Sequence, residues 1–336
     1  MIRVEHPGLL TTLQDTGRHG YQHLGLSPGG AMDPYSAAIA NALVGNPAEA
    51  AVLEITLQGP RLTLERPLWL ALTGADLSAE LDGEPLPSWR PVWCPAGSRL
   101  RFGRPRLGCR AYLAVAGGFA VPAVLGSRST DRRAGFGGLD GRALRAGDVV
   151  PVHGHALATP PDASRAWSPS WFVAWAEELA LDGHARLRLV PGDDWSALPE
   201  AGRRALGEEA YRVSPLSDRM GLRLEGPLLA LPGVGEKLSS GVAFGTLQLP
   251  PGGAPILLGA DRQTTGGYPV LGTVASVDHP RLAQLRPGEP VRFEPVDVDT
   301  AQDLRRAQAR RLQKLRAGLA LRWPLTTLAS PSRGSP

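Results

Sequence analysis

Four clusters of polar residues in glycine-containing segments are the parts of this sequence best suited to chemistry. They lie at residues 14–18, 126–130, 217–221 and 261–268, and each combines arginine with aspartate, serine or threonine. One such cluster is usual in a turn. Four of them between apolar segments predict loops that converge on one polar pocket.

The two C-terminal clusters supply the predicted catalytic residues. Asp218 and Asp261 suit a general acid or base, or a magnesium ligand, and Arg219 and Arg262 suit a carboxylate or phosphate group. We predict a catalytic set made of Asp218, Arg219, Asp261, Arg262 and Gln263. Aspartate and arginine also pair in purely structural turns, so that interpretation stays open for each residue.

The N-terminal cluster precedes a predicted helix that begins with Asp33 as N-cap and Pro34 as first helical residue. Gly29 and Gly30 let the backbone approach a ligand, and the helix N-terminus attracts anions. The alternative is an Asp15–Arg18 pair that only fixes the loop. The residues predicted from these clusters to contact substrate are Gln14, Asp15, Arg18, Gly29, Gly30, Asp33, Ser129, Thr130, Thr264, Gly267 and Tyr268.

Several standard motifs are missing from the sequence. The only lysines are Lys237 and Lys314, and neither lies in a phosphate-binding loop or in a Met-Lys biotin-attachment context. The pattern G-x-S-x-G at residues 25–29 lacks the helix that must follow a nucleophilic serine, so we interpret it as a loop. Two cysteines and an isolated H-x-H pair at 153–155 do not make a zinc site, and any metal ligands remain unknown.

The spacing of glycine and proline predicts a mainly β fold. The 336 residues include 41 glycines and 32 prolines, which separate short apolar runs such as 52–57, 62–64, 68–72, 111–115 and 186–190. Asp82-Gly83 is a strong hairpin-turn signal. We expect helices at 35–44 and 300–321, the latter with a solvated basic face, and a short helix at 171–181.

The chain is long enough for two domains. We predict an N-terminal β-barrel domain with one early helix over residues 1–160, a linker over 161–182, a C-terminal β-barrel domain over 183–297, and a basic helix with a disordered tail over 298–336. Two pairs of short segments have similar sequences, 59–64 with 226–231 and 97–102 with 288–293, which suggests that the two halves are related. The net charge of +4 is dispersed, which disfavours nucleic acid, and without an apolar leader or membrane span we expect a cytoplasmic protein.

The polar clusters, taken in order with several apolar motifs, resemble one family. The motifs are TLQDTGR at 12–18, GAMD at 30–33, NALVGN at 41–46, LEITLQGP at 53–60, LAVAGG at 113–118, LGSRST at 125–130, SDRMG at 217–221, QLP at 248–250 and DRQTTGGYP at 261–269. This set resembles the biotin-dependent carboxyltransferase family, also called the allophanate hydrolase subunit 2 family. It includes the C subunit of bacterial 5-oxoprolinase and KipA-like proteins.

The resemblance implies two cyclophilin-like β-barrel domains with a few short helices, and it adds Met32 and Gln248 to the predicted substrate contacts. It implies ATP-dependent cleavage of 5-oxoproline to L-glutamate, with ATP and Mg²⁺ used by the assembled complex. The implied partners are the B subunit of 5-oxoprolinase, which is KipI-like, and the A subunit, which is LamB/YcsF-like.

Two alternatives stay open. One is the carboxyltransferase component of a biotin-dependent urea carboxylase, with biotin on another chain, and the other is a non-enzymatic antagonist of a histidine-kinase inhibitor. Members of the family usually carry Ser-Glu-Gly where this chain has Ser239-Ser240-Gly241. If the glutamate has a chemical role, this chain lacks it.

Overall fold

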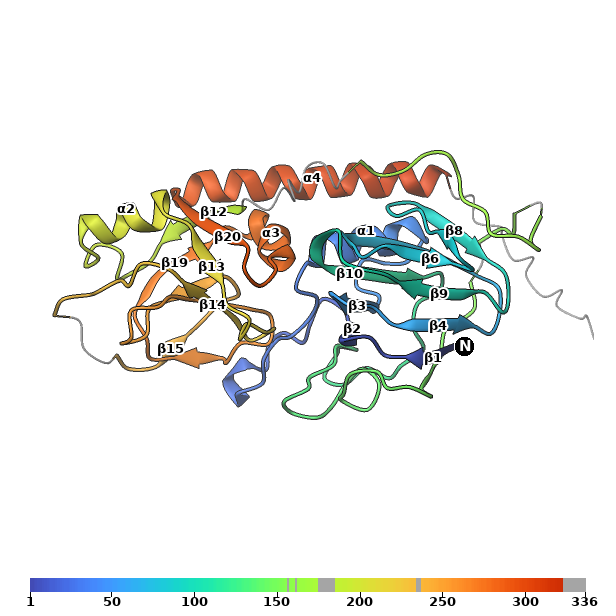
Figure 1. The fold of residues 1–336 in the computed structure, drawn as a ribbon, viewed down its shortest axis with the longest axis horizontal. Coiled ribbons are helices and arrows are strands. Elements are labelled where there is room, and N and C mark those ends of the chain that lie inside the picture. The colour runs from blue at the N-terminus through green and yellow to red at the C-terminus, as the bar shows by residue number, and fades with distance from the viewer. Residues whose placement is uncertain (156, 161, 175–184, 234–236, 323–336) are drawn as a thin grey trace, which may run out of the picture.

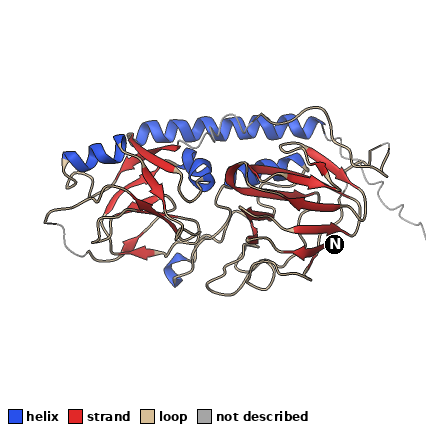
Figure 2. Ribbon diagram, viewed as in Figure 1, coloured by secondary structure: helices blue, strands red, loops and turns tan. Residues whose placement is uncertain are grey.

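The computed structural model describes residues 1–322 except 156, 161, 175–184 and 234–236. Two β-rich halves lie side by side, and one long helix runs along both of them (Figure 1). Strands dominate each half (Figure 2), which confirms the mainly β prediction. No helix in the described part of the chain is long and apolar enough to cross a membrane.

The N-terminal half contains two antiparallel sheets that face a shared apolar core. The six-stranded sheet has the order β11 (Val149–Val150), β1 (Ile2–His6), β4 (Arg61–Leu64), β9 (Arg99–Phe102), β6 (Ala79–Leu81) and β7 (Glu84–Pro85). The five-stranded sheet has the order β2 (Leu10–Gln14), β3 (Val52–Thr56), β10 (Leu107–Val115), β5 (Leu68–Asp76) and β8 (Pro91–Cys94).

The five-stranded sheet is buried on both faces, which explains the continuous apolar runs in its central strands. Along β5, Leu68 and Leu70 point into the core between the sheets, whereas Trp69 and Ala71 point to the opposite face. Helix α1 (Pro34–Leu43) covers that opposite face. Its start is as predicted, because the Asp33 carboxylate accepts hydrogen bonds from the backbone of the first turn.

The C-terminal half is built around a closed barrel with an apolar core of its own. The strands follow the order β12 (Ala185–Pro191), β19 (Val270–Val274), β16 (Thr246–Gln248), β17 (Ile256–Leu258), β14 (Gly221–Glu225), β13 (Tyr211–Val213) and β20 (Pro290–Pro295). The parallel pairing of β12 with β20 closes the ring. A small hairpin of β15 (Ser240–Gly241) and β18 (Thr265–Gly266) stands beside it.

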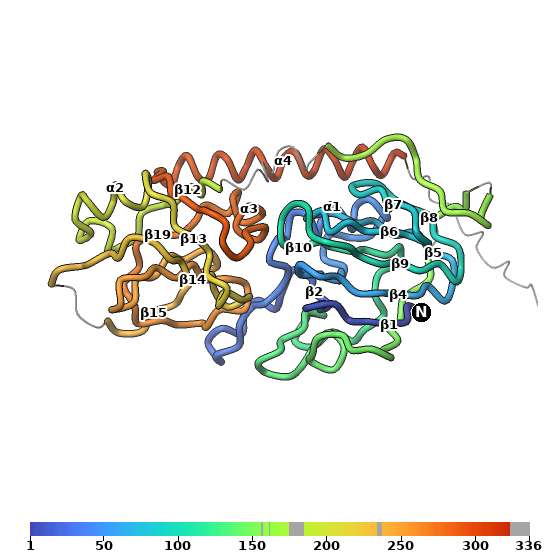
Figure 3. The backbone as a smooth tube through the Cα atoms, viewed as in Figure 1, coloured from blue at the N-terminus to red at the C-terminus, as the bar shows by residue number. Residues whose placement is uncertain are grey.

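The remaining helices lie around and between the two halves. They are the short 3-10 helix η1 (Gln22–Leu24), α2 (Glu200–Glu208), η2 (Ser276–Asp278) with the following α3 (His279–Gln284), and α4 (Val298–Arg322). Helix α3 contacts β10 of the N-terminal half as well as β12 of its own half. The N-terminal segment that carries η1 also runs beside the C-terminal half (Figure 3).

Helix α4 fastens the halves together. It contacts α1 in the N-terminal half and η2 and β12 in the C-terminal half. The Tyr35 hydroxyl donates to the Gln308 carbonyl over 2.6 Å, and the Gln308 side chain donates to the Val277 carbonyl over 3.2 Å. Leu319 is buried near its C-terminal end. The predicted helix over 300–321 is therefore confirmed.

Most local predictions agree with the structure. Asp82 and Gly83 both adopt positive φ between β6 and β7, as a tight hairpin turn requires. The helix expected at 171–181 is absent over residues 171–174, and the rest of it lies outside the described residues. Residues 97–102 and 288–293 both include strands, but 226–231 do not form one although 59–64 include β4.

Candidate functional site

A cavity of about 940 Å³ lies where the two halves meet. Its walls come from the ends of β2, β3 and β10 and from loops of the barrel half. The lining includes all five residues of the predicted catalytic set, Asp218, Arg219, Asp261, Arg262 and Gln263, and one predicted substrate contact, Thr264. Two of the four clusters predicted to converge, 217–221 and 261–268, therefore line one cavity, whereas no residue of 14–18 or 126–130 belongs to its lining.

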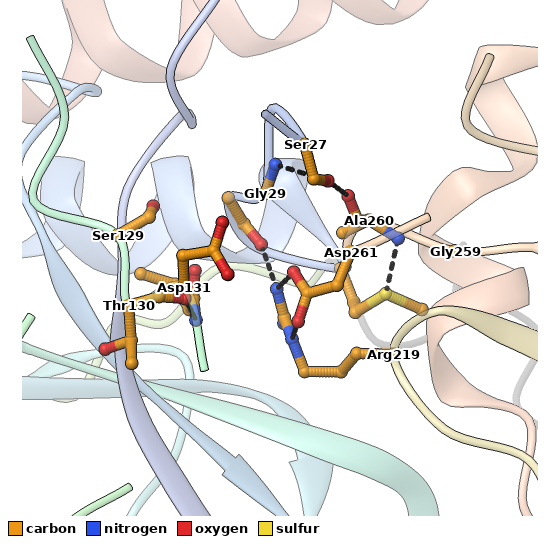
Figure 4. Close-up of polar contacts among 12 residues, drawn as sticks. Ser27, Gly29, Ser129, Thr130, Asp131, Arg219, Gly259, Ala260 and Asp261 are labelled. Atoms are coloured by element: carbon orange, nitrogen blue, oxygen red, sulfur yellow. Dashed lines mark hydrogen bonds and ion pairs between the residues drawn. The ribbon is translucent and has the colours of Figure 1, made fainter. Parts of the chain in front are cut away.

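Arg219 lies at the centre of the polar contacts between the halves. It follows β13, and its guanidinium is buried. Its Nε and Nη2 donate to the two carboxylate oxygens of Asp261 over 2.8 and 2.7 Å. Nη2 also donates to the Gly30 carbonyl over 2.7 Å, and Nη1 donates to the Glu54 carboxylate. Figure 4 shows this guanidinium beside Asp261, with the Asp131 carboxylate pointing toward the same region.

The partners of Arg219 stabilise the charged form of its guanidinium. Burial alone would lower the pKa of the guanidinium, but the carboxylates of Asp261 and Glu54 outweigh burial and raise it. Every nitrogen of this group donates within the protein. Arg219 is thus placed to orient Asp261 and to join the halves.

Glu54 is a buried member of this network that was not predicted as a site residue. It lies in β3 and accepts hydrogen bonds from the Met32 amide over 2.8 Å and the Tyr112 hydroxyl over 2.9 Å, besides Arg219. Its Oε1 also lies 3.9 Å from Arg110 Nε. One buried carboxylate therefore faces two buried guanidinium groups.

Arg262 is the buried arginine of the cavity that lacks a carboxylate partner among the described residues. Its Nε donates to the Val242 carbonyl over 3.1 Å and Nη1 contacts the Gly259 carbonyl at 3.4 Å. Burial lowers the pKa of its guanidinium, and the neighbouring Asp261 partly offsets that effect. A buried cation without a counter-charge suits an anionic ligand.

The other residues of the C-terminal clusters lie less deeply. Asp218 is exposed, and its Oδ1 accepts from the amides of Met220 over 2.8 Å and Gly221 over 3.3 Å, which fixes a turn at the cavity edge. Gly267 and Tyr268 lie beyond the cavity lining, and Tyr268 is exposed. Gln248 is buried in β16, and its Nε2 has no hydrogen-bond partner among the described residues.

The predicted contacts at 14–18 and 126–130 form a buried network instead of cavity wall. Asp15 accepts from the hydroxyls of Ser127 and Ser129, each over 2.6 Å. Thr130 donates to the Leu13 carbonyl over 3.0 Å, and Gln14 Nε2 donates to the Thr130 carbonyl over 3.3 Å. These bonds hold the loop of residues 125–130 against β2.

Arg18 belongs to that network and does not form the Asp15 ion pair considered from the sequence. Its Nη2 donates to the Ser129 carbonyl over 2.7 Å, and its guanidinium stacks 4.6 Å from the centre of the Phe136 ring. Its Nη1 has no partner among the described residues. A Cβ at Gly29 would lie 3.9 Å from this nitrogen and 3.8 Å from Asp261 Oδ1, so the three residues are close.

In the segment before α1, residues 29–33 do not line the cavity, and the N-terminus of α1 is not available to bind a ligand there. The Asp33 carboxylate caps Tyr35 and Ser36, so the first helix amides already have an anionic acceptor. Burial raises the pKa of Asp33 despite these hydrogen bonds. Met32 Sδ accepts from the Ala260 amide over 3.2 Å. Gly29, Gly30, Met32 and Asp33 are not part of the cavity lining, and their role as a substrate anchor stays a prediction.

Several residues that line the cavity were missed from the sequence: Thr56, Cys109, Arg110, Asp131, Arg132 and Arg133. Asp131 to Arg133 directly follow the motif at 125–130. Extending that cluster by three residues would therefore have included them among the predicted site residues. Thr56 and Arg110 lie in apolar strands, where one polar residue carries little signal. In all, five arginines and three aspartates line the cavity, which favours an anionic ligand.

Comparison with known proteins identifies the family. The family model described as "Carboxyltransferase domain, subdomain A and B" matches residues 24–295, which include both halves and the cavity between them. The chain belongs to the carboxyltransferase domain family.

Individual relatives of this carboxyltransferase domain differ in length. The chain is 39% identical to the C subunit of 5-oxoprolinase from Escherichia coli K12 over 316 residues, 94% of this chain and 97% of the relative. It is 35% identical to the Haemophilus influenzae protein of the same name over 91% and 94% of the two chains. The solved urea amidolyase of K. lactis superposes with a TM-score of 0.83 at 29% identity, covering 94% of this chain but only 20% of the amidolyase.

Ser240, the position at which the resemblance led us to expect a glutamate, can also be placed. Ser240 lies exposed in β15 and pairs with Gly266 of β18. Thr265, which precedes Gly266 in β18 and pairs with Gly241, lines the cavity. A glutamate at position 240 would therefore stand on the hairpin beside the cavity, where this carboxyltransferase domain has a short hydroxyl side chain.

Proposed function

We propose that this chain is the C subunit of an ATP-dependent 5-oxoprolinase, which opens 5-oxoproline to L-glutamate together with the A and B subunits. The observation that carries the proposal is the end-to-end match to a protein named as the C subunit of 5-oxoprolinase, which covers 94% of this chain and 97% of the relative. The proposed partners are a KipI-like B subunit and a LamB/YcsF-like A subunit, and the proposed location is the cytoplasm.

The cavity has the charge that this reaction needs. A lactam is a stable amide, and ATP supplies the phosphoryl group that activates its carbonyl oxygen. Arg262 is buried at the cavity without a carboxylate partner among the described residues, so it is suited to stabilise negative charge on that oxygen. Exposed Arg132 and Arg133 add positive charge at the same cavity for the phosphates.

Asp261 is the residue best placed to handle a proton. Arg219 holds both of its oxygens, and its side chain is 23% exposed, so one edge of a fixed carboxylate faces the cavity. A carboxylate in that position orients an attacking water and accepts its proton. Arg219 then acts as a positioning residue, because its nitrogens are already occupied.

The residues present also fit magnesium held mainly through ATP. Asp131 lines the cavity and offers the oxygen ligands that Mg²⁺ prefers, whereas both oxygens of Asp261 already accept from Arg219. Among the described residues, no group of three or more His, Cys, Asp or Glu side chains has the arrangement of a metal site. Mg²⁺ commonly binds one or two carboxylates and takes its other ligands from phosphates and water.

A second function is favoured by the fold. The superposition on the K. lactis urea amidolyase covers 94% of this chain, so a carboxyltransferase reaction from carboxybiotin to urea is the alternative. It requires biotin on a partner chain. The alternative as an antagonist of a kinase inhibitor needs binding of that inhibitor and no catalysis.

Reconstitution separates these functions. The chain is co-purified with its A and B partners, and glutamate formed from 5-oxoproline is measured with and without ATP. We expect glutamate only with ATP and only when all three chains are present. A folded three-chain complex that forms no ATP-dependent glutamate refutes the proposal, and urea-dependent consumption of carboxybiotin would establish the alternative.

A further inference from the structure

Two residues of the cavity wall each carry a buried polar atom without a hydrogen bond. Thr56 ends β3, and Arg110 lies opposite it in β10 as its cross-strand partner. Their side chains are buried, with 9% and 4% of the residue surface exposed, and both residues line the cavity. Thr56 Oγ1 and Arg110 Nε are without hydrogen-bond partners among the described residues. A buried polar group without a hydrogen bond lowers the stability of the folded protein, so this pair points to a ligand that supplies the missing hydrogen bonds.

The backbone is shaped to place this pair. The register between β10 and β5 shifts between Leu107 and Ala111, and such bulges redirect side chains near functional sites. Gly108 has φ of 71° within the bulge, and a Cβ there would lie 2.7 Å from Gln284 Oε1. Leu57 after Thr56 has φ of 54°, which is unusual for a residue with a side chain.

Helix α3 fixes the guanidinium from the other half. Gln284 Oε1 accepts from the Cys109 and Arg110 amides, each over 2.9 Å, and Arg110 Nη1 donates to the Ala283 carbonyl over 2.6 Å. These contacts anchor the backbone and one end of the guanidinium and leave Nε without a hydrogen bond, 3.9 Å from the Glu54 carboxylate. The pair is therefore preorganised by contacts that do not involve a ligand.

The charge around the pair suits a monoanion. Arg110 Nε lies 3.9 Å from the Glu54 carboxylate, which is shared with Arg219, so the positive charge of Arg110 is partly balanced. Arg262, with no such partner among the described residues, is better suited to a phosphoryl group. A carboxylate fits the first position, because one oxygen accepts from Nε and the other from the threonine hydroxyl.

We propose that Thr56 and Arg110 form the subsite for the carboxylate of the substrate. This assignment rests on the proposed function for the identity of the substrate, 5-oxoproline. It distinguishes two anion positions in one cavity, with the carboxylate against β3 and β10 and the phosphoryl group against Arg262. Both residues bind substrate here and take no part in bond making or breaking.

The test measures binding without turnover. Isothermal titration of the assembled three-chain complex without ATP compares 5-oxoproline with 2-pyrrolidinone, the same lactam without its carboxylate. Wild type should bind 5-oxoproline more tightly. Thr56→Val, which keeps the side-chain shape but loses the hydroxyl, should weaken 5-oxoproline binding about tenfold and leave 2-pyrrolidinone unchanged. Thr56→Ser should restore most of the loss.

Two further variants complete the design. Arg110→Gln should weaken 5-oxoproline at least as much as Thr56→Val, with thermal unfolding used to confirm folding. Thr63→Val is the matched control, because Thr63 lies in β4 and donates to Glu5 outside the cavity lining. It should bind both lactams like wild type.

The outcomes separate this assignment from the proposed function. Equal affinity of wild type for the two lactams, or no binding of either, overturns the subsite, as does unchanged 5-oxoproline binding by Thr56→Val. If Thr56→Val raises the KM for ATP instead, the pair holds a phosphoryl group and the carboxylate assignment is wrong. A complex that discriminates between the lactams but forms no glutamate refutes the proposed function alone.

Discussion

Replacing Glu54 by glutamine tests whether the two halves are joined through one buried charge network. The substitution removes the carboxylate that faces both Arg219 and Arg110 while keeping the shape of the side chain. The amide oxygen of glutamine still accepts from Met32 and Tyr112, but its NH₂ group meets the donors of Arg219. The result is a buried guanidinium that keeps Asp261 and loses its other carboxylate.

The expected cost follows from the burial of the pair. Arg219 and Glu54 side chains are 4% and 1% exposed, so solvent replaces little of the lost interaction. Removing one partner of a buried ion pair costs about 3 kcal/mol or more. Arg219→Met should cost a similar amount. The double variant Glu54→Gln/Arg219→Met should cost about 2 kcal/mol less than the sum of the two single changes, because neither charge is then left alone.

The assay is urea unfolding followed by tryptophan fluorescence, for which the chain offers eight tryptophans. The matched control is Glu80→Gln, because Glu80 pairs with Arg101 at the surface, where the side chains are 32% and 60% exposed. That change should cost less than about 1 kcal/mol. A cost of Glu54→Gln no greater than that of Glu80→Gln, or single costs that simply add, would refute the reasoning.

Two other predictions concern pH and the long helix. Burial lowers the pKa of His279 to about 4, so the folded state favours the neutral ring, and the stability it contributes is present above pH 6.5 and lost as pH falls toward 4. His279→Phe, which keeps the ring stacked near Phe244, should flatten the fall in the free energy of unfolding between these pH values, and an unchanged slope would contradict this. Leu319→Ala removes a buried contact of α4 and should cost about 2–3 kcal/mol by urea unfolding, whereas exposed Leu321→Ala should cost little, and equal costs would disprove the packing argument.

The parts of the site that the sequence predicted are those carried by short glycine-containing loops. Asp218 to Arg219 and Asp261 to Gln263 were recognisable because turn residues bring polar groups between apolar strands. These two clusters line one cavity, whereas the clusters at 14–18 and 126–130, predicted to converge with them, do not line it. The function assigned to each stays a prediction, although the contacts of Arg219 favour positioning over substrate binding.

The parts that sequence reasoning missed depend on contacts over long distances along the chain. Glu54 and Arg219 are 165 residues apart, and only the folded structure shows that each is the partner of the other. Arg110 is one polar residue in an apolar strand, and its backbone amide is held by Gln284 of the other half. Local patterns carry no information on such pairs.

The fold was predictable in class and only partly in arrangement. The apolar runs located five strands, β3, β4, β5, β10 and β12, and the N-cap Asp33 located α1. Helices α2 and α3 were missed, because both are short and are stabilised by packing, α2 on β20 and α3 on both β12 and β10, more than by a long apolar period. The N-terminal strands form two sheets and the C-terminal strands a closed barrel, a difference that depends on which distant edges pair.

Substitution of Arg262 in the assembled enzyme tests the central claim, that the cavity between the halves is where 5-oxoproline is opened. Glutamate formation is measured for three-chain complexes that carry wild-type or Arg262→Ala chains of equal thermal stability, with Thr63→Val as control. We predict a fall in kcat/KM of about a hundredfold or more for Arg262→Ala and none for the control. Normal turnover by a folded Arg262→Ala complex would contradict it.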